Sequence, residues 1–206
     1  MSKYGHRPHN WFEAIVNKLG GEEKAEAFLR GELEVVEPKR AWREEDGVIY
    51  FTLTSDGTTG QEWISRLEES GFRVRDYAKS VLCSHDFRPT TGVTTVVAVL
   101  KGMFFEDCDR VTGKIRDEAT KRGLTNPGAE VACLIREKFS DKDIEAMGLW
   151  WIVTMHDPIK DSDGVPCLLG AYRDGDGSWL VADYDGLDSW WYRECGFAFV
   201  AAQVGA

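Results

Sequence analysis

The stretch Gly177–Val200, GSWLVADYDGLDSWWYRECGFAFV, places three tryptophans, two tyrosines and three aspartates close to the end of the chain. A strand period organises only its last positions, where Phe197 and Phe199 alternate with small residues. Segments near a chain end are usually polar and frayed. Large aromatic side chains at such a place are instead typical of binding surfaces.

The whole chain of 206 residues is long enough for one domain with a substantial core and a small additional element. Its 43% hydrophobic and 12% aromatic residues are typical of a globular protein. The 35 acidic and 25 basic residues give a formal net charge of −10, which disfavours a nucleic-acid partner. The five cysteines are widely spaced and odd in number, so free thiols are expected rather than disulfides or a zinc site.

The first residues are polar, and no apolar run reaches the roughly 18 residues that a membrane span requires. Neither a signal peptide nor a membrane span is therefore predicted. The expected location is the cytoplasm, and display at the cell surface by another route stays open.

Apolar residues at helical spacing predict two short amphipathic helices within residues 11–29. A charged connector follows Pro38, so residues 1–38 are expected to form a helical extension and residues 39–206 the main domain. Capping residues and glycine stops predict further helices at 59–71, 75–84, 110–123 and 126–148.

Details of these helices are also predicted. Thr59 and Glu62 have the spacing of a capping box. Tyr77 is expected to point inward. Asn126 is the expected cap of the last helix, with Pro127 as its first residue.

Runs of β-branched and aromatic residues predict strands at 48–54, 92–105, 149–156, 167–173 and 196–204. Trp150 and Trp151 are adjacent in one of these strands and are expected on opposite faces of the sheet. The order of the elements predicts an α+β fold with helices early and antiparallel strands late.

Two Asp-Gly turns, at residues 161–164 and 174–177, place carboxylates two residues apart as calcium loops do. Neither is followed by the remaining ligands of a twelve-residue calcium loop, so ordinary turns are favoured. Glycine-rich phosphate loops and zinc-protease motifs are missing from the sequence. We therefore expect no metal and no cofactor.

His156 stands beside Asp157 at the end of a predicted strand and is a candidate general base. Cys195 is a candidate nucleophile. No motif connects the two residues, so an enzyme that uses His156 or Cys195 is kept as the alternative function. A third possibility is an adaptor that binds its partner through the N-terminal helices.

Between His156 and Cys195 there are nine acidic and three basic residues, a net charge of −6. Charge alone indicates a solvated surface. Here the aspartates are interleaved with tyrosine, tryptophan, serine and glycine, a combination typical of antibody-like binding surfaces. The negative charge favours a target with a basic patch, a protein or another macromolecule.

Residues 168–204, LLGAYRDGDGSWLVADYDGLDSWWYRECGFAFVAAQV, resemble the C-terminal variable region of diversity-generating retroelement variable proteins. The chain from about Trp42, including GLWWIVTMHDPIKDSDG at residues 148–164, is similar to archaeal and candidate-phylum members of this group. The resemblance implies a C-type lectin fold of the formylglycine-generating-enzyme-like subtype. It also implies a variable region at about residues 168–200, which a retroelement rewrites at adenines to form a selectable, non-enzymatic ligand-binding site.

Changes at the adenines of an asparagine codon reach tyrosine, aspartate, serine, cysteine, glycine, alanine, valine and leucine, but not lysine, glutamine, methionine or tryptophan. Residues 168–200 contain no lysine, glutamine or methionine and only one glutamate. Trp190 requires a different parent codon. The implied variable, ligand-binding residues are Tyr172, Asp174, Asp176, Val181, Ala182, Asp183, Tyr184, Leu187, Asp188, Ser189, Trp190, Tyr192 and Cys195.

Fixed scaffold residues alternate with this variable set; they are Trp179, Trp191, Gly196, Phe197 and Phe199. Their aromatic members are expected to be buried. Tyr184, Asp183, Asp188 and Tyr192 are expected on one exposed face, with Cys195 exposed beside them. The calcium-ligating runs of sugar-binding C-type lectins are missing from the sequence, so the resemblance does not imply calcium-dependent sugar binding.

Overall fold

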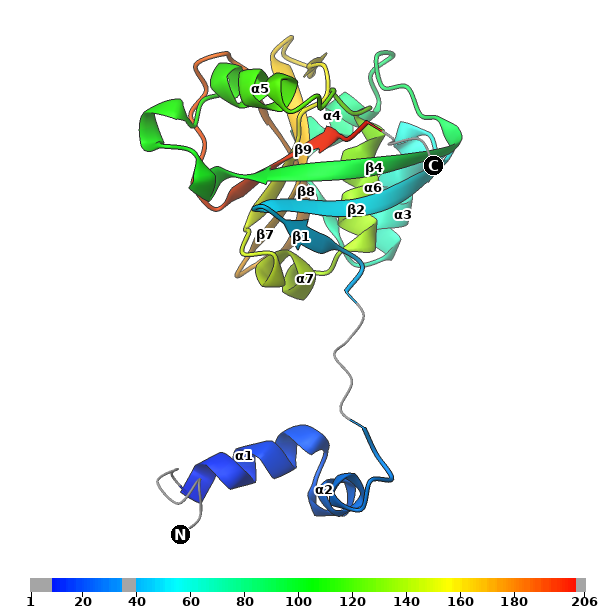
Figure 1. Ribbon diagram of the computed structural model, residues 1–206. Coiled ribbons are helices and arrows are strands. Elements are labelled where there is room, and N and C mark those ends of the chain that lie inside the picture. The colour runs from blue at the N-terminus through cyan, green and yellow to red at the C-terminus, as the bar shows by residue number, and fades with distance from the viewer. Residues whose placement is uncertain (1–8, 35–39, 203–206) are drawn as a thin grey trace. The chain divides into compact units, whose positions relative to one another are not determined.

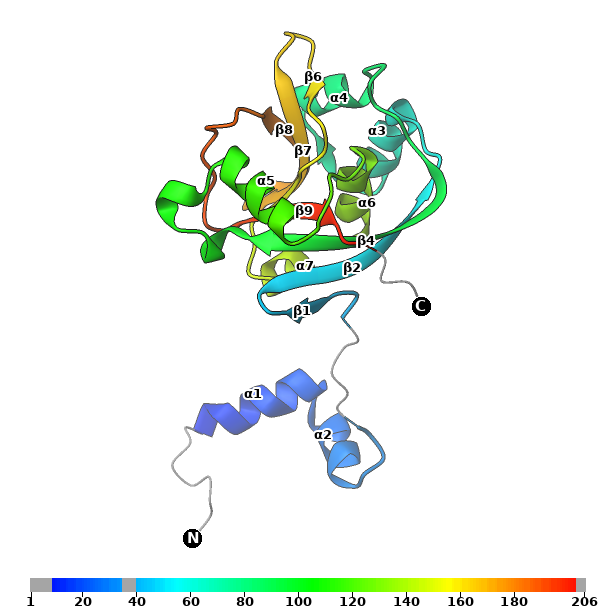
Figure 2. The same cartoon turned by 45° about the horizontal axis from the view of Figure 1, so that its top comes forward.

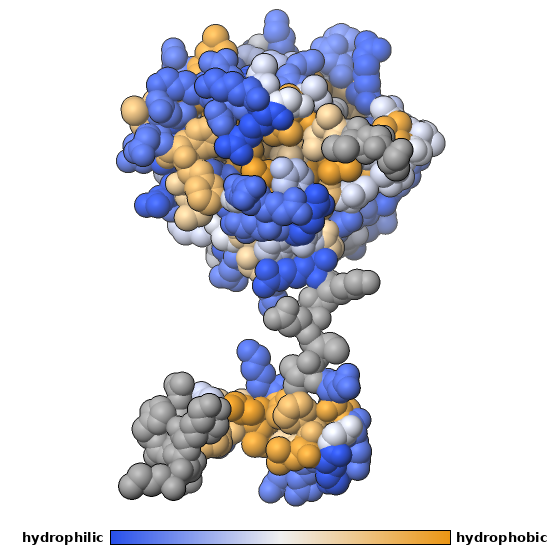
Figure 3. Space-filling model, in the orientation of Figure 1, coloured by the Kyte–Doolittle hydropathy of each residue, from blue (hydrophilic) through white to orange (hydrophobic). Residues whose placement is uncertain are grey.

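The computed structural model describes residues 9–34 and 40–202, and the chain divides into two units between Arg40 and Ala41. The first unit contains α1 (His9–Leu19) and α2 (Glu22–Leu29), two helices that the sequence predicts. Among its described residues only Ala25 is buried, while Phe12 and Leu29 are exposed. Apolar side chains therefore gather on the surface of these helices (Figure 3).

The second unit is built on one large sheet (Figure 1). Its strands are β1 (Arg43–Glu45), β2 (Val48–Asp56), β3 (Arg73–Val74), β4 (Thr91–Lys101), β5 (Trp151–Thr154), β6 (Ile159–Lys160), β7 (Pro166–Asp174), β8 (Gly177–Tyr184) and β9 (Cys195–Val200). They lie in the order β1-β2-β4-β9-β5-β7-β8-β3, and β6 pairs with β7. Only the pairs β5–β9 and β3–β8 are parallel among the described strands.

Helices cover both faces of this sheet (Figure 2). The core on one face includes side chains of α3 (Gly60–Glu69), α4 (Asp76–Leu82), α6 (Glu130–Lys138) and α7 (Asp141–Ala146). The core on the other face includes side chains of α5 (Thr112–Lys121). Strand pleating divides the side chains between the two cores: Phe197 and Phe199 of β9 face α5, whereas Ala198 faces the opposite core.

The protein is thus α+β with a large, mostly antiparallel sheet, as the sequence predicts. The strands are not confined to the later part of the chain, because β2 and β4 precede α5, α6 and α7. The last strand, β9, lies between β4 and β5 in the interior of the sheet. This position buries residues 195–199, the last part of the aromatic stretch.

The single helix expected over residues 126–148 is wrong. Asn126 does not cap a helix; its amide donates to the Asp157 carboxylate at 2.8 Å. The first helix, α6, begins only at Glu130, and a second capping box at Ser140 and Asp143 starts α7. A serine followed by an acidic residue three positions later marks this break in the sequence.

Two other local expectations differ from the structure. Tyr77 is 52% exposed rather than inward, although Val81 on the same helix is fully buried. Residues 177–184 show no strand period in the sequence and yet form β8, which pairs with β7 along its whole length. Adjacent residues Leu180 and Val181 of β8 are both buried, so the strand lacks the alternation of apolar and polar residues that marks a half-buried strand.

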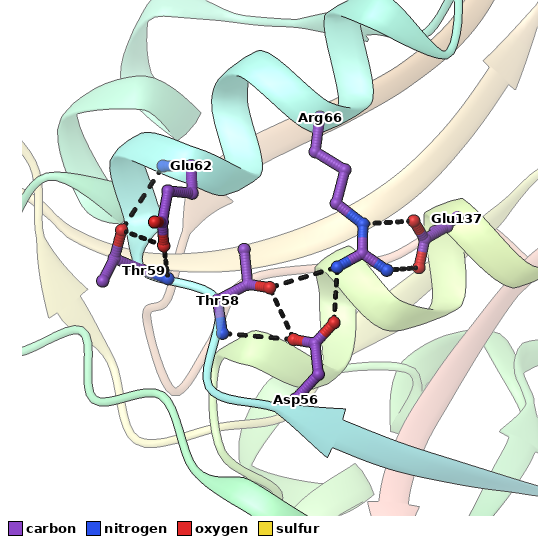
Figure 4. A network of polar contacts seen from close by, with 6 residues as sticks. All are labelled: Asp56, Thr58, Thr59, Glu62, Arg66 and Glu137. Atoms are coloured by element: carbon purple, nitrogen blue, oxygen red, sulfur yellow. Dashed lines mark hydrogen bonds and ion pairs between the residues drawn. The ribbon is translucent and has the colours of Figure 1, made fainter.

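The capping box at Thr59 and Glu62 is confirmed and adjoins a polar network on α3 (Figure 4). The Arg66 guanidinium makes two hydrogen bonds to Glu137 of α6 and one to Asp56 at the end of β2. Hydrogen bonds from Thr58 and Arg66 lower the pKa of Asp56 to about 2. The network joins α3, α6 and β2, far along the chain from the aromatic tail.

Candidate ligand-binding surface

A surface hollow of about 490 Å³ lies where the start of β5, the end of β7, the middle of β8 and the loop before β9 meet. Among the side chains that line it are residues of the predicted variable set, namely Tyr172, Val181, Ala182, Asp183 and Tyr192. They come from β7, β8 and the loop that follows. The pairing of β7 with β8 brings the members on these two strands together, because Gly170 and Val181 are opposite each other and Tyr172 lies opposite Trp179.

Sequence reasoning missed the other residues that line the hollow: Arg75, Trp150 and Trp151. The two tryptophans were expected on opposite faces, but β5 begins only at Trp151, so the strand alternation does not include Trp150. Trp150 is 55% exposed, whereas Trp151 packs edge-on against Tyr172 with 5.7 Å between ring centroids. No local signal points to Arg75, which the parallel pairing of β3 with β8 brings to this place.

The loop from Asp185 to Glu194 presents apolar side chains to solvent. Leu187 is 72% exposed and Tyr192 is 61% exposed. Trp190 is also exposed and packs edge-on against Tyr192 with 5.1 Å between ring centroids. Exposed apolar side chains in one contiguous place mark a surface for association. The expected exposure of Asp183, Tyr184, Asp188 and Tyr192 is confirmed.

The same loop is held to α5 through its main chain. The N–H groups of Thr112 and Gly113 donate to the carbonyl oxygens of Ser189 and Leu187, at 3.1 and 2.9 Å. The first N–H groups of a helix have no acceptor within the helix, so the loop carbonyls complete the start of α5. The N–H of Trp191 in turn donates to the carbonyl of Arg110 at 3.0 Å.

Buried arginines extend this main-chain anchoring. The Arg110 guanidinium donates to the carbonyls of Gly102 at 3.0 Å, Phe105 at 3.2 Å and Trp191 at 3.4 Å. Arg136 is fully buried and donates to the carbonyl of Tyr172 at 3.3 Å. These contacts do not depend on which side chain stands at the anchored position.

Most of the predicted scaffold is buried. Trp191, Gly196, Phe197 and Phe199 are each less than one tenth exposed. The Trp191 indole N–H donates to the Thr112 hydroxyl at 2.9 Å. A Cβ atom at Gly196 would lie 2.6 Å from Val99 and 2.7 Å from Leu149, so a larger residue would displace these buried side chains.

The expectation that Trp179 is buried is wrong, since its ring is only partly covered. It lies near the edge of the sheet, where Arg73 and Arg75 are stacked on its ring at 5.0 and 4.9 Å from the centroid. Its indole N–H donates to Asp174 at 3.2 Å. Two arginines thus replace the apolar neighbours that the sequence suggested.

The expectation that Cys195 is exposed is also wrong. Cys195 is the first residue of β9, and the period of two places it on the same face as Phe197 and Phe199. It is 2% exposed, and burial raises the pKa of its thiol to about 12. A thiol in this state is not nucleophilic at neutral pH. All five cysteines are free, as the sequence predicts.

The structure does not bring His156 and Cys195 together. Cys195 lies opposite Trp151 at one end of β5, whereas His156 follows the other end. Both ring nitrogens of His156 bind the backbone: Nδ1 lies 2.7 Å from the Asp157 carbonyl, and Nε2 accepts from the Leu169 N–H at 2.9 Å. Burial lowers the pKa of this imidazole to about 4. The arrangement is that of a structural histidine.

The Asp-rich turns are closed by their own side chains. Asp161 accepts from the N–H groups of Asp163 and Val165, each at 2.9 Å. Asp174 accepts from the N–H of Asp176 at 2.8 Å, at the tip of the β7–β8 hairpin and outside the hollow's lining. Within the described part of the chain, no three His, Cys, Asp or Glu side chains are grouped so that they could hold a metal ion.

A larger hollow of about 660 Å³ lies between the β1–β2 turn and α5. Its lining includes charged side chains that are paired with one another, such as Lys114 with Asp109 and Arg122 with Glu118. None of the predicted site residues contributes to it. The aromatic hollow is therefore the better candidate for a binding site.

Comparison with protein-family models, with curated proteins and with solved structures finds no match. No helix in the described ranges combines the length and the apolar character needed to cross a membrane.

Proposed function

We propose that this protein is a non-enzymatic ligand-binding protein whose C-terminal region, residues 168–200, is diversified by a retroelement. The proposal includes a C-type lectin fold of the formylglycine-generating-enzyme-like subtype. That finer assignment rests on the resemblance of the tail and body to variable proteins, together with the α+β architecture.

One observation carries the proposal: most of the side chains predicted to vary line the hollow or belong to the exposed loop of residues 185–194, while the main chain beneath them is held by other residues. Carbonyls of Leu187, Ser189 and Trp191 accept from α5 and Arg110. Tyr172 is held in the same manner by Arg136. Such anchoring tolerates exchange of the exposed side chains without loss of the backbone conformation.

Because Cys195 is buried, we remove it from the proposed ligand contacts. The remaining contacts are the residues that line the hollow and the exposed residues of the loop. The acidic charge of this region supports a target with a basic patch. A location in the cytoplasm remains part of the proposal.

The genomic neighbourhood tests diversification. We expect a reverse-transcriptase gene and a near-copy of the codons for residues 168–200 that differs from them only at adenines. A neighbourhood without such a copy, or a copy whose differences are spread over all four bases, would contradict the proposal.

A further inference from the structure

The aromatic hollow combines ring faces with a carboxylate. Rings of Trp150, Trp151, Tyr172 and Tyr192 line it together with the side chain of Asp183. Asp183 is exposed, and one of its carboxylate oxygens accepts from the Tyr184 N–H at 2.8 Å, which orients the group. The faces of tryptophan and tyrosine rings attract cations, and tryptophan does so most strongly.

The charge of the segment that supplies most of the hollow's lining favours the same ligand chemistry. The segment from His156 to Cys195 has a net charge of −6. Among the described residues, Arg75 is the one basic side chain in the lining, and its guanidinium is stacked 4.9 Å from the ring centroid of Trp179. The guanidinium of Arg73 lies 5.0 Å from the centroid of the same ring. The protein therefore already stacks arginine on tryptophan immediately beside the hollow.

We propose that the aromatic hollow binds an arginine side chain presented by a protein target. A planar guanidinium stacks on a ring and at the same time donates two parallel hydrogen bonds to a carboxylate. The exposed rings of Trp150 and Tyr192 and the carboxylate of Asp183 supply those partners. A hollow of about 490 Å³ has room for the side chain together with adjoining parts of a peptide.

The inference rests on the proposed binding function of this surface, but not on its diversification. Trp150 and Trp151 precede residue 168, so they form a fixed wall of the hollow under the proposal. Asp183 and Tyr192 belong to the predicted variable set. The specificity for arginine is therefore expected of this sequence and not of every variant of it.

The test uses the full chain labelled with ¹⁵N at the tryptophan indoles and the peptide acetyl-Gly-Gly-Arg-Gly-Gly-amide. We expect the peptide to shift the indole signal of Trp150, which is identified by its loss in Trp150→Ala, while the buried Trp63 signal stays in place. The same peptide with citrulline, which is neutral and nearly isosteric, is expected to bind about tenfold more weakly.

Matched variants locate the effect. Asp183→Asn should weaken the arginine peptide about tenfold, whereas Asp163→Asn, an exposed acid in the turn between β6 and β7 and outside the hollow's lining, should leave its affinity within about twofold. Equal binding of citrulline, equal effects of the two variants, or no shift of Trp150 up to the solubility of the peptide would each overturn the inference.

Failure here is distinguishable from failure of the proposed function. A genome with the adenine-restricted copy and a hollow that does not respond to arginine would overturn only the arginine inference. A responsive hollow in a genome without the copy would overturn only diversification.

Discussion

At the scale of single residues, adjacent aromatic positions in the tail have opposite roles. Trp191 is 3% exposed and packs against Trp151 and Phe197 with centroid separations of 5.4 and 6.0 Å. Tyr192 projects into solvent and lines the hollow. The sequence WWY at 190–192 therefore contains one core residue between two surface residues.

Substitution by serine should separate these roles. Trp191→Ser should lower the free energy of unfolding by about 3–5 kcal/mol, because it empties a large buried volume and leaves the Thr112 hydroxyl without the indole donor. Tyr192→Ser should change it by no more than about 0.5 kcal/mol. Urea denaturation of both variants provides the comparison, and equal losses would contradict the assignment.

Gly170 leaves room for the ring of Trp151, which lines the hollow. A Cβ atom there would lie 2.2 Å from Nε1 of Trp151 and 2.9 Å from the carbonyl of Ile152. We predict that Gly170→Ala costs about 1–3 kcal/mol and displaces the Trp151 ring. Thermal unfolding and the Trp151 indole shift measure the two effects. Gly175→Ala, where nothing lies within 4 Å of an added Cβ, is the control; the same loss in both variants would refute this account.

His156 makes stability depend on pH. Burial holds the pKa of the folded imidazole at about 4, below the 6.5 of an exposed histidine. As the pH falls, the unfolded chain binds the proton first, so stability is complete above pH 6.5 and is lost towards pH 4. Relative to His156→Gln, the native protein should lose about 2–3 kcal/mol over this range. Parallel pH profiles for the two proteins would rule out this role of His156.

At the scale of elements, the start of α5 and the loop of residues 185–194, here the tail loop, satisfy each other's main-chain hydrogen bonds. The N–H groups of Thr112 and Gly113 donate to carbonyls of the loop. Arg110 is 3% exposed and its guanidinium donates to three carbonyls. The tail loop thus takes its conformation from an element about 80 residues earlier in the chain. Proximity in the sequence gives no sign of this pairing.

Removing the arginine should loosen the loop. Arg110→Met leaves three carbonyls without this donor, and we expect a loss of about 2 kcal/mol together with faster hydrogen exchange at the amides of Thr112, Gly113 and Trp191. Arg122→Met, at the exposed end of the same helix, should leave these amides protected. Unchanged exchange in Arg110→Met would contradict the anchoring role.

Regular elements could be predicted where one face is evenly buried. The alternating burial of β2 is of this kind. The capping box of α3 could be predicted as well, because its residue types and spacing are visible in the sequence. Prediction from periodicity fails for β8, because adjacent Leu180 and Val181 are both buried. It also fails at Cys195, although the period that makes Phe197 and Phe199 inward already places Cys195 with them.

At the scale of the whole molecule, composition and element order were enough to predict an α+β protein, but not the path of its sheet. The insertion of β9 between β4 and β5 and the pairing of β3 with β8 depend on contacts between distant segments. Those contacts bring Arg75 and Trp150 to the same hollow as Tyr192. The predicted site thus contained the lining residues that come from residues 168–200 and lacked Arg75, Trp150 and Trp151, which come from earlier segments.

Under the proposed function, the exposed tail positions vary between copies of the gene while the residues that hold them do not. Deep sequencing of the coding region for residues 168–200 in many cells of one natural population measures this directly. We predict amino-acid differences concentrated at Asp183, Tyr184, Leu187, Asp188 and Tyr192, with Trp191, Gly196, Phe197 and Phe199 constant. A uniform tail, or differences distributed equally over exposed and buried positions, would contradict the proposed diversification.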